Sequence, residues 1–296
     1  MTNKITQAKS ALRSVLAHFS PRRRRWQQFL RSLPLDPDQL ALPLTELAPG
    51  DFIICGSPRT GTTLVSGLLF QPPKIVTVME PWDGMRMPPA ELFASLREEI
   101  TQTGMLRRGK LDIAALVNSG KIQWQQEGQS AFNVEVDSDF ILGVKWPAYW
   151  RYIPLMPNTK FLVCLRHPYE VINSFKQIGG RVAQGLQYDI RFNQKLNQEL
   201  MAATPKREIR RILLYDYIHM RILPHLERDN VFVVRYERWF TEPEQLLQEM
   251  GDFLGKPLSS GHVNIRHPGK PSSITEEEKE LIKKHCKTAH LLGYTL

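Results

Sequence analysis

The chain has 296 residues, 42% of them apolar, and a formal net charge of +9. A chain of this size buries a substantial core, which excludes a disulfide-stapled miniprotein and a disordered tail. No apolar run approaches the roughly 18 residues of a transmembrane helix, and the first twenty residues lack the apolar core of a secretory signal.

The positive charge is concentrated near the N-terminus. Eight basic residues, among them Arg22–Arg25, precede the first acidic residue, Asp36, so the rest of the chain is nearly neutral. Residues 5–19 place their apolar side chains on one arc of a helical wheel. We therefore expect residues 1–45 to form a basic N-terminal helix and a proline-rich connection.

This N-terminal arm favours an anionic partner or a surface of its own domain. Residues 1–33 could bind an anionic membrane surface or an acidic polymer, and they could equally pack on the chain that follows. Nucleic acid is disfavoured, because the body is nearly neutral and the basic run has no interleaved aromatic residues.

From residue 46 the chain alternates short apolar runs with helical patterns. The expected strands cover residues 51–56, 74–80, 140–144, 160–165 and 231–234. The expected helices cover residues 62–70, 89–103, 168–178, 243–254 and 275–292, with a long helical stretch over 186–228 that kinks at Pro224. This alternation predicts an α/β fold for residues 46–296, a single domain with a parallel sheet flanked by helices.

Cysteine and histidine usage predicts neither disulfides nor a metal site. The chain has three cysteines and no Cys-x-x-Cys pair. Cys55 and Cys164 lie inside apolar runs and are expected to pack as small apolar side chains. The histidine pairs His262/His267 and His285/His290 lack the i, i+4 spacing that brings two imidazoles together on a helix. A reducing, cytoplasmic location fits this pattern.

Residues 56–63, Gly-Ser-Pro-Arg-Thr-Gly-Thr-Thr, have the form of a phosphate-binding loop. They follow an expected strand and open an expected helix, where backbone N–H groups can converge on an anion. Their spacing is that of the P-loop Gly-x4-Gly-Lys-[Ser/Thr], but Thr62 stands at the lysine position and the basic residue is Arg59. The following strands end at Glu80, Lys145 and Arg166 rather than at a magnesium-binding aspartate, which disfavours an ATPase or kinase.

Residues 58–64, Pro-Arg-Thr-Gly-Thr-Thr-Leu, resemble the 5′-phosphosulfate loop of sulfotransferases that use 3′-phosphoadenosine 5′-phosphosulfate (PAPS). The form is closest to that of bacterial and tyrosylprotein sulfotransferases. Arg166 at a strand end, with Ser174 eight residues later, is similar to the second motif of the family. The resemblance covers about residues 50–296. It implies a P-loop-like fold, PAPS as co-substrate, no required metal and a hydroxyl-bearing acceptor.

The resemblance also implies three catalytic residues. Glu80, 21 residues after Arg59, has the spacing of the catalytic base in tyrosylprotein sulfotransferases. Lys145, in Val-Lys-Trp-Pro, resembles the lysine that supports the leaving phosphate. Arg59 would help to neutralise charge on that phosphate.

The cofactor-binding residues follow from the same motifs. For the 5′-phosphosulfate, the resemblance implies Arg59, Thr60, Gly61, Thr62 and Thr63. For the 3′-phosphate it implies Arg166 and Ser174, with Lys270 as a further cofactor-binding residue. The segments 235–237 (Arg-Tyr-Glu) and 292–294 (Leu-Gly-Tyr) also resemble landmarks of the family.

The acceptor is not identified by the sequence. Trp82, Trp124, Trp146 and Trp150 flank the expected base and lysine, and they favour a carbohydrate or lipid-borne hydroxyl. Two alternative functions stay open. One is an ATP-dependent kinase with a degenerate loop, and the other is a non-enzymatic adaptor that keeps the fold and binds membranes or partners.

Overall fold

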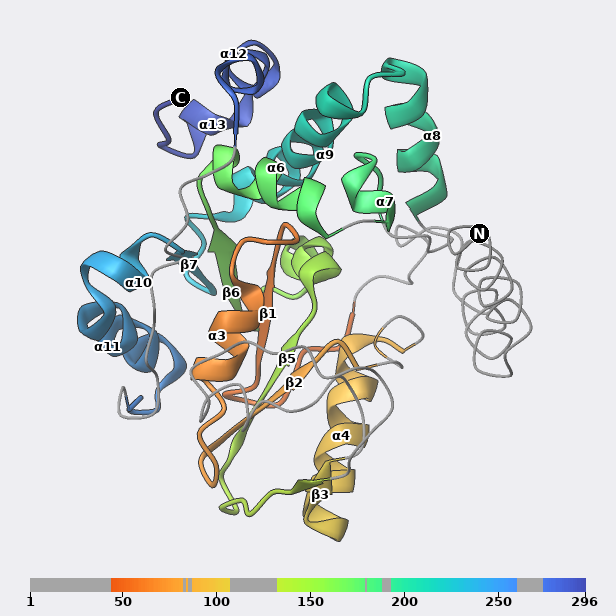
Figure 1. The fold of residues 1–296 in the computed structure, drawn as a ribbon. Helices are drawn as coiled ribbons and strands as arrows, with labels where there is room; N and C mark the ends of the chain where they lie inside the picture. The colour runs from red at the N-terminus through yellow and green to blue at the C-terminus, as the bar shows by residue number, and fades with distance from the viewer. Residues whose placement is uncertain are drawn as a thin grey trace, which may run out of the picture.

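Five parallel strands form the central sheet of the computed structural model (Figure 1). They are β1 (Phe52–Gly56), β2 (Ile75–Met79), β5 (Ile141–Lys145), β6 (Lys160–Leu165) and β7 (Val231–Arg235). Their order in the sheet is β2-β5-β1-β6-β7, and every neighbouring pair is parallel. The structure confirms all five expected strands, each to within one residue at either end.

The structure describes residues 44–81, 84, 87–106, 132–178, 180–187, 193–259 and 274–296. The arm expected over residues 1–45 lies almost entirely outside these ranges, as do Lys270, Trp82 and Trp124. Within the described ranges, the helices are all too short or too polar to cross a membrane.

Helices cover both faces of the sheet, which gives three layers. Along β1, Phe52 and Ile54 point to one face and Ile53 and Cys55 to the other, as the two-residue period of a strand requires. The first face packs against α3 (Thr62–Leu68) and α11 (Pro243–Leu254), and the second against α4 (Pro89–Thr103), α6 (Pro168–Gln177) and α9 (Arg207–Ile222). The predicted α/β fold is therefore confirmed.

Both predicted core cysteines are fully buried. Cys55 belongs to one apolar cluster and Cys164 to the other, so the two thiols lie on opposite faces of the sheet. Burial raises the pKa of both thiols.

The expected single helical stretch over residues 186–228 is wrong. The structure has α8 (Gln194–Ala203), a break, and then α9, which ends in the 3₁₀ turn η5 (Leu223–His225). The break arises because Thr204 precedes Pro205 and is extended, with φ −165° and ψ 141°. Pro224 lies in the terminal turn, so it ends the helix instead of kinking it.

Several short elements were not predicted. They are the strands β3 (Met105–Leu106) and β4 (Phe132–Asn133), which pair antiparallel, and the helices η3 (Pro147–Leu155), α7 (Gly180–Ala183) and α10 (Arg238–Thr241). The helix expected over 275–292 is also divided, into α12 (Glu276–His285) and α13 (Thr288–Leu291).

Asp216 on α9 explains the division between α12 and α13. Its carboxylate accepts hydrogen bonds from the backbone N–H groups of Lys287 (2.8 Å) and Thr288 (3.0 Å) and from the Thr288 hydroxyl (2.6 Å). A carboxylate from a neighbouring helix thus caps α13 and fixes the C-terminal segment on α9.

We expect Asp216→Ala to lower the free energy of unfolding by about 3 kcal/mol, because it leaves buried donors without an acceptor. Urea unfolding followed by circular dichroism measures this change. Glu280→Ala, which breaks an exposed pair with Lys283, is the control and should leave the midpoint unchanged. Equal midpoints for both variants would contradict the role assigned to Asp216.

His219 is fully buried in the same helix. One ring nitrogen, Nδ1, lies 2.8 Å from the Tyr215 carbonyl oxygen, and Nε2 has no hydrogen-bond partner among the described residues. Burial lowers the pKa of His219 to about 4, from an ordinary value of 6.5. The folded protein therefore holds this imidazole neutral.

The pKa shift of His219 predicts a loss of stability in acid. Between pH 6.5 and 4 the unfolded chain gains a proton that the folded chain does not, so stability falls as pH falls, by up to about 3 kcal/mol. His219→Leu should flatten this dependence. The free energy of unfolding of both proteins, measured at about pH 7.5, 5.5 and 4.5, tests this prediction. If it changed with pH by the same amount in both proteins, His219 would be excluded as the cause.

Candidate active site

The loop between β1 and α3 lies tightly against its neighbours. Gly61 has φ +96°, and a Cβ atom there would lie 2.5 Å from Cδ2 of Tyr236. Gly56 has φ +141°, and a Cβ atom there would lie 2.5 Å from the carbonyl oxygen of Cys164 on β6. Only glycine fits these two positions, so the loop backbone is pressed between β6 and the Tyr236 ring.

The threonines of the loop face two directions. The Thr60 hydroxyl donates a 2.7 Å hydrogen bond to the Ser57 carbonyl and is buried, so this side chain braces the turn. Thr62 and Thr63 begin α3 and line a cavity. No side chain caps the first turn of α3, and uncapped N–H groups at a helix start attract anions.

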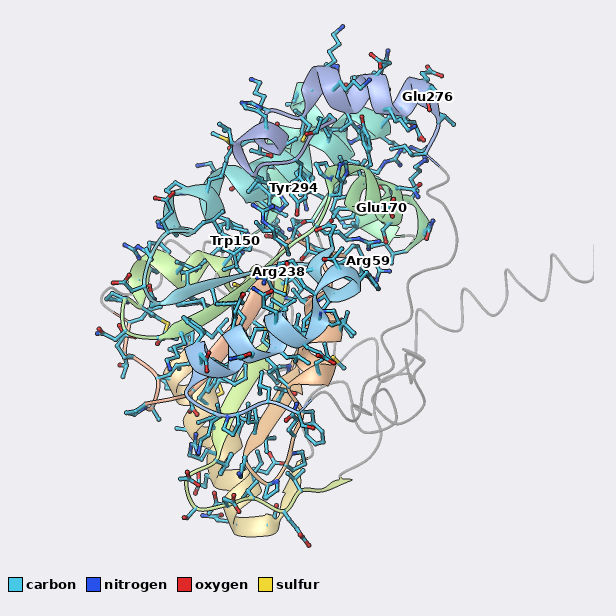
Figure 2. All side chains as sticks on the ribbon, turned by 90° about the vertical axis from the view of Figure 1, so that its left-hand side faces the viewer. Arg59, Trp150, Glu170, Arg238, Glu276 and Tyr294 are labelled. Carbon is cyan, nitrogen blue, oxygen red and sulfur yellow. The ribbon has the colours of Figure 1, made fainter. Side chains whose placement is uncertain are left out.

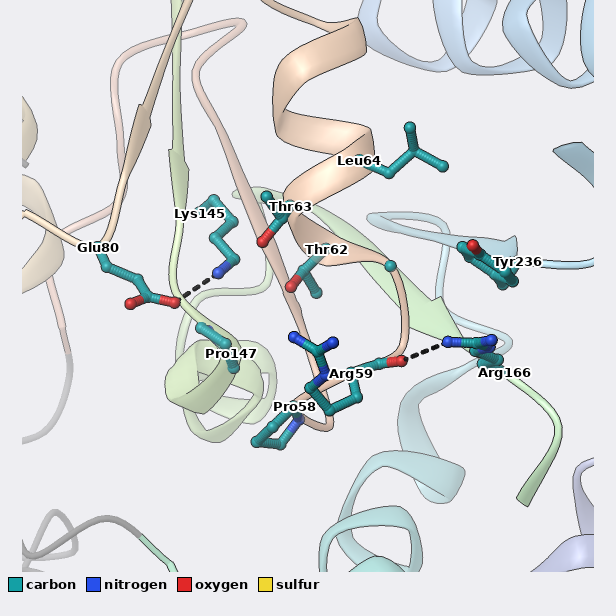
Figure 3. A pocket seen from close by; sticks show the side chains of 11 residues that line it. Pro58, Arg59, Thr62, Thr63, Leu64, Glu80, Lys145, Pro147, Arg166 and Tyr236 are labelled. Atoms are coloured by element: carbon teal, nitrogen blue, oxygen red, sulfur yellow. Dashed lines mark hydrogen bonds and ion pairs between the residues drawn. The ribbon is translucent and has the colours of Figure 1, made fainter. Parts of the chain in front are cut away.

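A cavity of about 360 Å³ opens at the carboxyl ends of the strands. Figure 3 shows Glu80 and Lys145 on one side of it, Arg166 and Tyr236 on the other, and the loop between them. The predicted site residues that line it are Arg59, Gly61, Thr62, Thr63, Glu80, Lys145 and Arg166. Thr60 and Ser174 are not among the lining residues, although Ser174 contacts the lining residue Arg59. Lys270 lies outside the described residues.

Glu80 and Lys145 form an ion pair in the cavity wall. Lys145 Nζ lies 2.5 Å from Glu80 Oε1, and the Glu80 N–H donates to the Lys145 carbonyl at 2.8 Å. The pairing of β2 with β5 sets Met79 opposite Lys145, which brings the next residue, Glu80, beside it. The Lys145 side chain is only 3% exposed, and a buried ammonium is stabilised by a carboxylate partner.

Glu80 also has an uncommon backbone conformation. Its φ is +44°, in the left-handed region, as is that of Arg59 at +73°. These are the two non-glycine residues with positive φ in the described part of the chain. Such conformations are costly and occur often at functional sites.

Arg166, directly after β6, is held from several sides. Its guanidinium carbon lies 4.2 Å from the Tyr236 ring centroid, and its terminal nitrogens contact the Arg59 carbonyl (3.4 Å) and Glu170 (3.2 Å). Its Nε is buried and has no hydrogen-bond partner among the described residues. A buried donor without a partner next to a cavity fits an anionic ligand.

Arg59 contacts the helix that follows Arg166. Its Nε donates a 2.8 Å hydrogen bond to the hydroxyl of Ser174 on α6. Figure 2 labels Arg59 close to Glu170, another residue of α6. The structure therefore places Arg59 in contact with both Arg166 and Ser174.

The two C-terminal landmarks contact each other behind Arg166. Glu237 accepts a 2.7 Å hydrogen bond from the His167 N–H, and Tyr294 donates to Glu237 at 3.4 Å. Arg235 donates to the Leu292 carbonyl at 2.7 Å. These contacts fix the start of α6, which carries Arg166 at its entry.

Tyr236 is the site residue whose role sequence reasoning missed. It lines the cavity, stacks on Arg166 and occupies the space beside Gly61. The segment 235–237 was noted as a landmark, but a lone tyrosine does not reveal an arginine partner 70 residues away. Burial raises the pKa of Tyr236, so its hydroxyl stays neutral.

No group of three or more His, Cys, Asp or Glu side chains able to hold a metal ion occurs among the described residues. His262 and His267 lie outside them.

Comparisons with solved structures give similar chains at low identity. The sulfotransferase domain from the curacin biosynthetic pathway is 17% identical, with 85% of this chain and 100% of that chain covered and a TM-score of 0.45. A sulfotransferase from Alicyclobacillus acidocaldarius is also 17% identical, with 84% and 98% covered and a TM-score of 0.42. Retinol dehydratase in complex with androsterone and inactive cofactor PAP is 15% identical, with 84% and 83% covered and a TM-score of 0.38.

No curated protein sequence matches the chain. A family model described as "Sulfotransferase family" matches residues 50–260, from just before β1 to beyond α11. Because the TM-scores are all below 0.5, the assignment comes from this model, whose match covers well over half of the chain. The protein belongs to the sulfotransferase family.

Proposed function

We propose that this protein transfers a sulfuryl group from PAPS to a hydroxyl acceptor, with Glu80 as general base. The observation that carries the proposal is the meeting of Glu80, Lys145 and the phosphate-binding loop in the wall of one cavity. Family membership supports sulfuryl transfer as the reaction.

The loop side of the cavity suits the 5′-phosphosulfate. Thr62 and Thr63 offer hydroxyls and helix-start N–H groups, and Gly61 lets the backbone turn toward the ligand. Arg59 and Lys145 supply positive charge in the same wall. These groups are the donors that a doubly anionic ligand needs.

The opposite side suits the 3′-phosphate. Arg166 has its unpartnered Nε there, and the Tyr236 ring holds the plane of its guanidinium. Ser174 lies two turns along α6, and its hydroxyl is hydrogen-bonded to Arg59, which lines the cavity. We propose Arg166 and Ser174 as ligands of the 3′-phosphate, and Lys270 as a further cofactor-binding residue.

The proposed reaction is an in-line transfer. The acceptor oxygen forms a bond to sulfur while the bond from sulfur to the bridging oxygen breaks, and the electron pair stays on the departing 5′-phosphate. The acceptor proton passes to Glu80, and Lys145 and Arg59 stabilise the charge that grows on the phosphate. Because Lys145 and Arg59 supply positive charge to the departing phosphate, we propose that no metal ion is required.

The Glu80–Lys145 pair links these two roles. When Lys145 turns its ammonium toward the phosphate, its ion pair with Glu80 breaks. A carboxylate whose ion pair with an ammonium is broken binds a proton more readily. Donor binding therefore prepares Glu80 to accept the proton of the acceptor hydroxyl.

For the acceptor we propose a carbohydrate or lipid-borne hydroxyl. Of the two described tryptophans near the site, Trp150 is buried in the core, whereas Trp146 is half-buried. Trp146 directly follows Lys145 and stacks with Tyr149 at a centroid distance of 5.8 Å. Its face supports an acceptor with a ring or an apolar body.

We expect 3′-phosphoadenosine 5′-phosphate (PAP) to bind the wild-type protein without added metal. Arg166→Ala should weaken binding by about 1.5–3 kcal/mol, because a charged hydrogen bond is lost. Titration calorimetry measures both affinities, with Arg221→Ala, an exposed change on α9, as the control. Binding of ATP with magnesium but not of PAP would overturn the proposal in favour of a kinase, and binding of neither would favour an adaptor.

Glu80→Gln should reduce turnover by about 10²–10⁴-fold, because the proton acceptor is lost. Its affinity for PAP should not fall, because Lys145 and the loop remain. Release of PAP from PAPS, with the best acceptor from a panel of glycosides and alcohols, measures the rate. Glu80→Asp, which keeps a carboxylate, should recover part of the activity. A Glu80→Gln enzyme with undiminished turnover would rule out Glu80 as the base.

A further inference from the structure

Arg59 contacts both residues proposed for the 3′-phosphate, although its own place is in the phosphate-binding loop. Its side-chain Nε donates to Ser174 Oγ at 2.8 Å, and its carbonyl oxygen accepts from Arg166 at 3.4 Å. In Figure 3 the dashed line between Arg59 and Arg166 marks the second of these contacts. One loop residue thus joins the end of β6 to the second turn of α6.

The hydrogen bond to Ser174 determines what that hydroxyl can still do. A serine hydroxyl has one proton to donate and lone pairs that accept. Because Ser174 Oγ accepts from Arg59, its own proton is directed elsewhere, and no acceptor for it is found in the described part of the chain. Ser174 is 9% exposed, so this proton is available to a ligand that reaches α6.

The backbone of Arg59 makes both contacts possible. Its φ of +73° is unusual for a residue with a side chain. In this conformation the carbonyl is directed to Arg166 while the side chain extends to α6. The carbonyl contact occupies one terminal nitrogen of Arg166, and Glu170 occupies the other, which leaves the buried Nε.

We propose that Arg59 is a positioning residue for recognition of the 3′-phosphate, acting through Ser174 and Arg166. It thereby determines the preference for a nucleotide that carries a 3′-phosphate over one that lacks it. The inference rests on the proposed function, since it assumes that the cavity binds PAPS. It adds a role to a loop residue otherwise assigned to the 5′ end.

The test compares two probes, PAP and adenosine 5′-monophosphate (AMP), which lacks the 3′-phosphate. The wild-type protein should bind PAP more tightly than AMP. Arg59→Lys keeps the charge and the backbone carbonyl but loses the Nε donor. It should weaken PAP binding about tenfold and change AMP binding less than about twofold. If the role of Arg59 were purely structural, Arg59→Lys would weaken the binding of PAP and of AMP equally.

Two further variants test the path through Ser174. Ser174→Ala should lower the preference for PAP over AMP as Arg59→Lys does. The double variant should show no further fall beyond that of Ser174→Ala, because the Arg59 side chain acts through the Ser174 hydroxyl, which Ser174→Ala already removes. Arg238→Lys, which alters an arginine paired with Glu242 and Glu249 away from the cavity, is the matched control and should change neither affinity.

Equal losses of PAP and AMP binding in Arg59→Lys would overturn the inference, and so would additive effects in the double variant. Either result would leave the proposed function intact. A folded wild-type protein that binds PAP no better than AMP would overturn the proposed function itself. If thermal unfolding shows that Arg59→Lys does not fold, Arg59→Gln replaces it, and the ratio of its affinities for PAP and AMP is compared with that of the wild-type protein.

Discussion

The parallel register of β2, β5, β1 and β6 is the constraint on which the site depends. Because the strands are parallel, their carboxyl ends lie at the same edge of the sheet, and residues far apart in the chain become neighbours at that edge. Glu80 lies beside Lys145 because Met79 is opposite Lys145, and Arg166 lies beside the loop because Gly56 is opposite Cys164. A slip in register would separate Glu80 from Lys145.

A second theme is that the cavity's cations already have partners within the protein. Lys145 is paired with Glu80, Arg59 with Ser174, and Arg166 with Glu170 and Tyr236. Anion binding here is therefore an exchange of partners as much as a gain of contacts. Such pairing keeps each cation oriented and limits the desolvation cost when a ligand arrives.

The sheet was predictable from the sequence because each strand is a short apolar run, and the loop was predictable because its glycines and its context are local. The breaks in the helices were harder to predict. The break after α8 arises because Pro205 holds Thr204 in an extended conformation, and the division after α12 depends on Asp216, 71 residues before Lys287. The inward hydroxyl of Thr60 and the stacking of Tyr236 on Arg166 are tertiary contacts, which no residue pattern encodes. The family resemblance suggested candidate site residues, but only the fold reveals the hydrogen bonds and ion pairs among them.

The burial of the cysteines has a practical consequence. All three thiols of the chain are buried, and burial raises the pKa of each, that of Cys286 to about 12. The nucleophile in alkylation is the thiolate, which these sites suppress. Maleimide modification of the native protein then reports opening of the structure: Cys286 senses detachment of the C-terminal segment, and Cys55 and Cys164 sense separation of the sheet from its two helical layers.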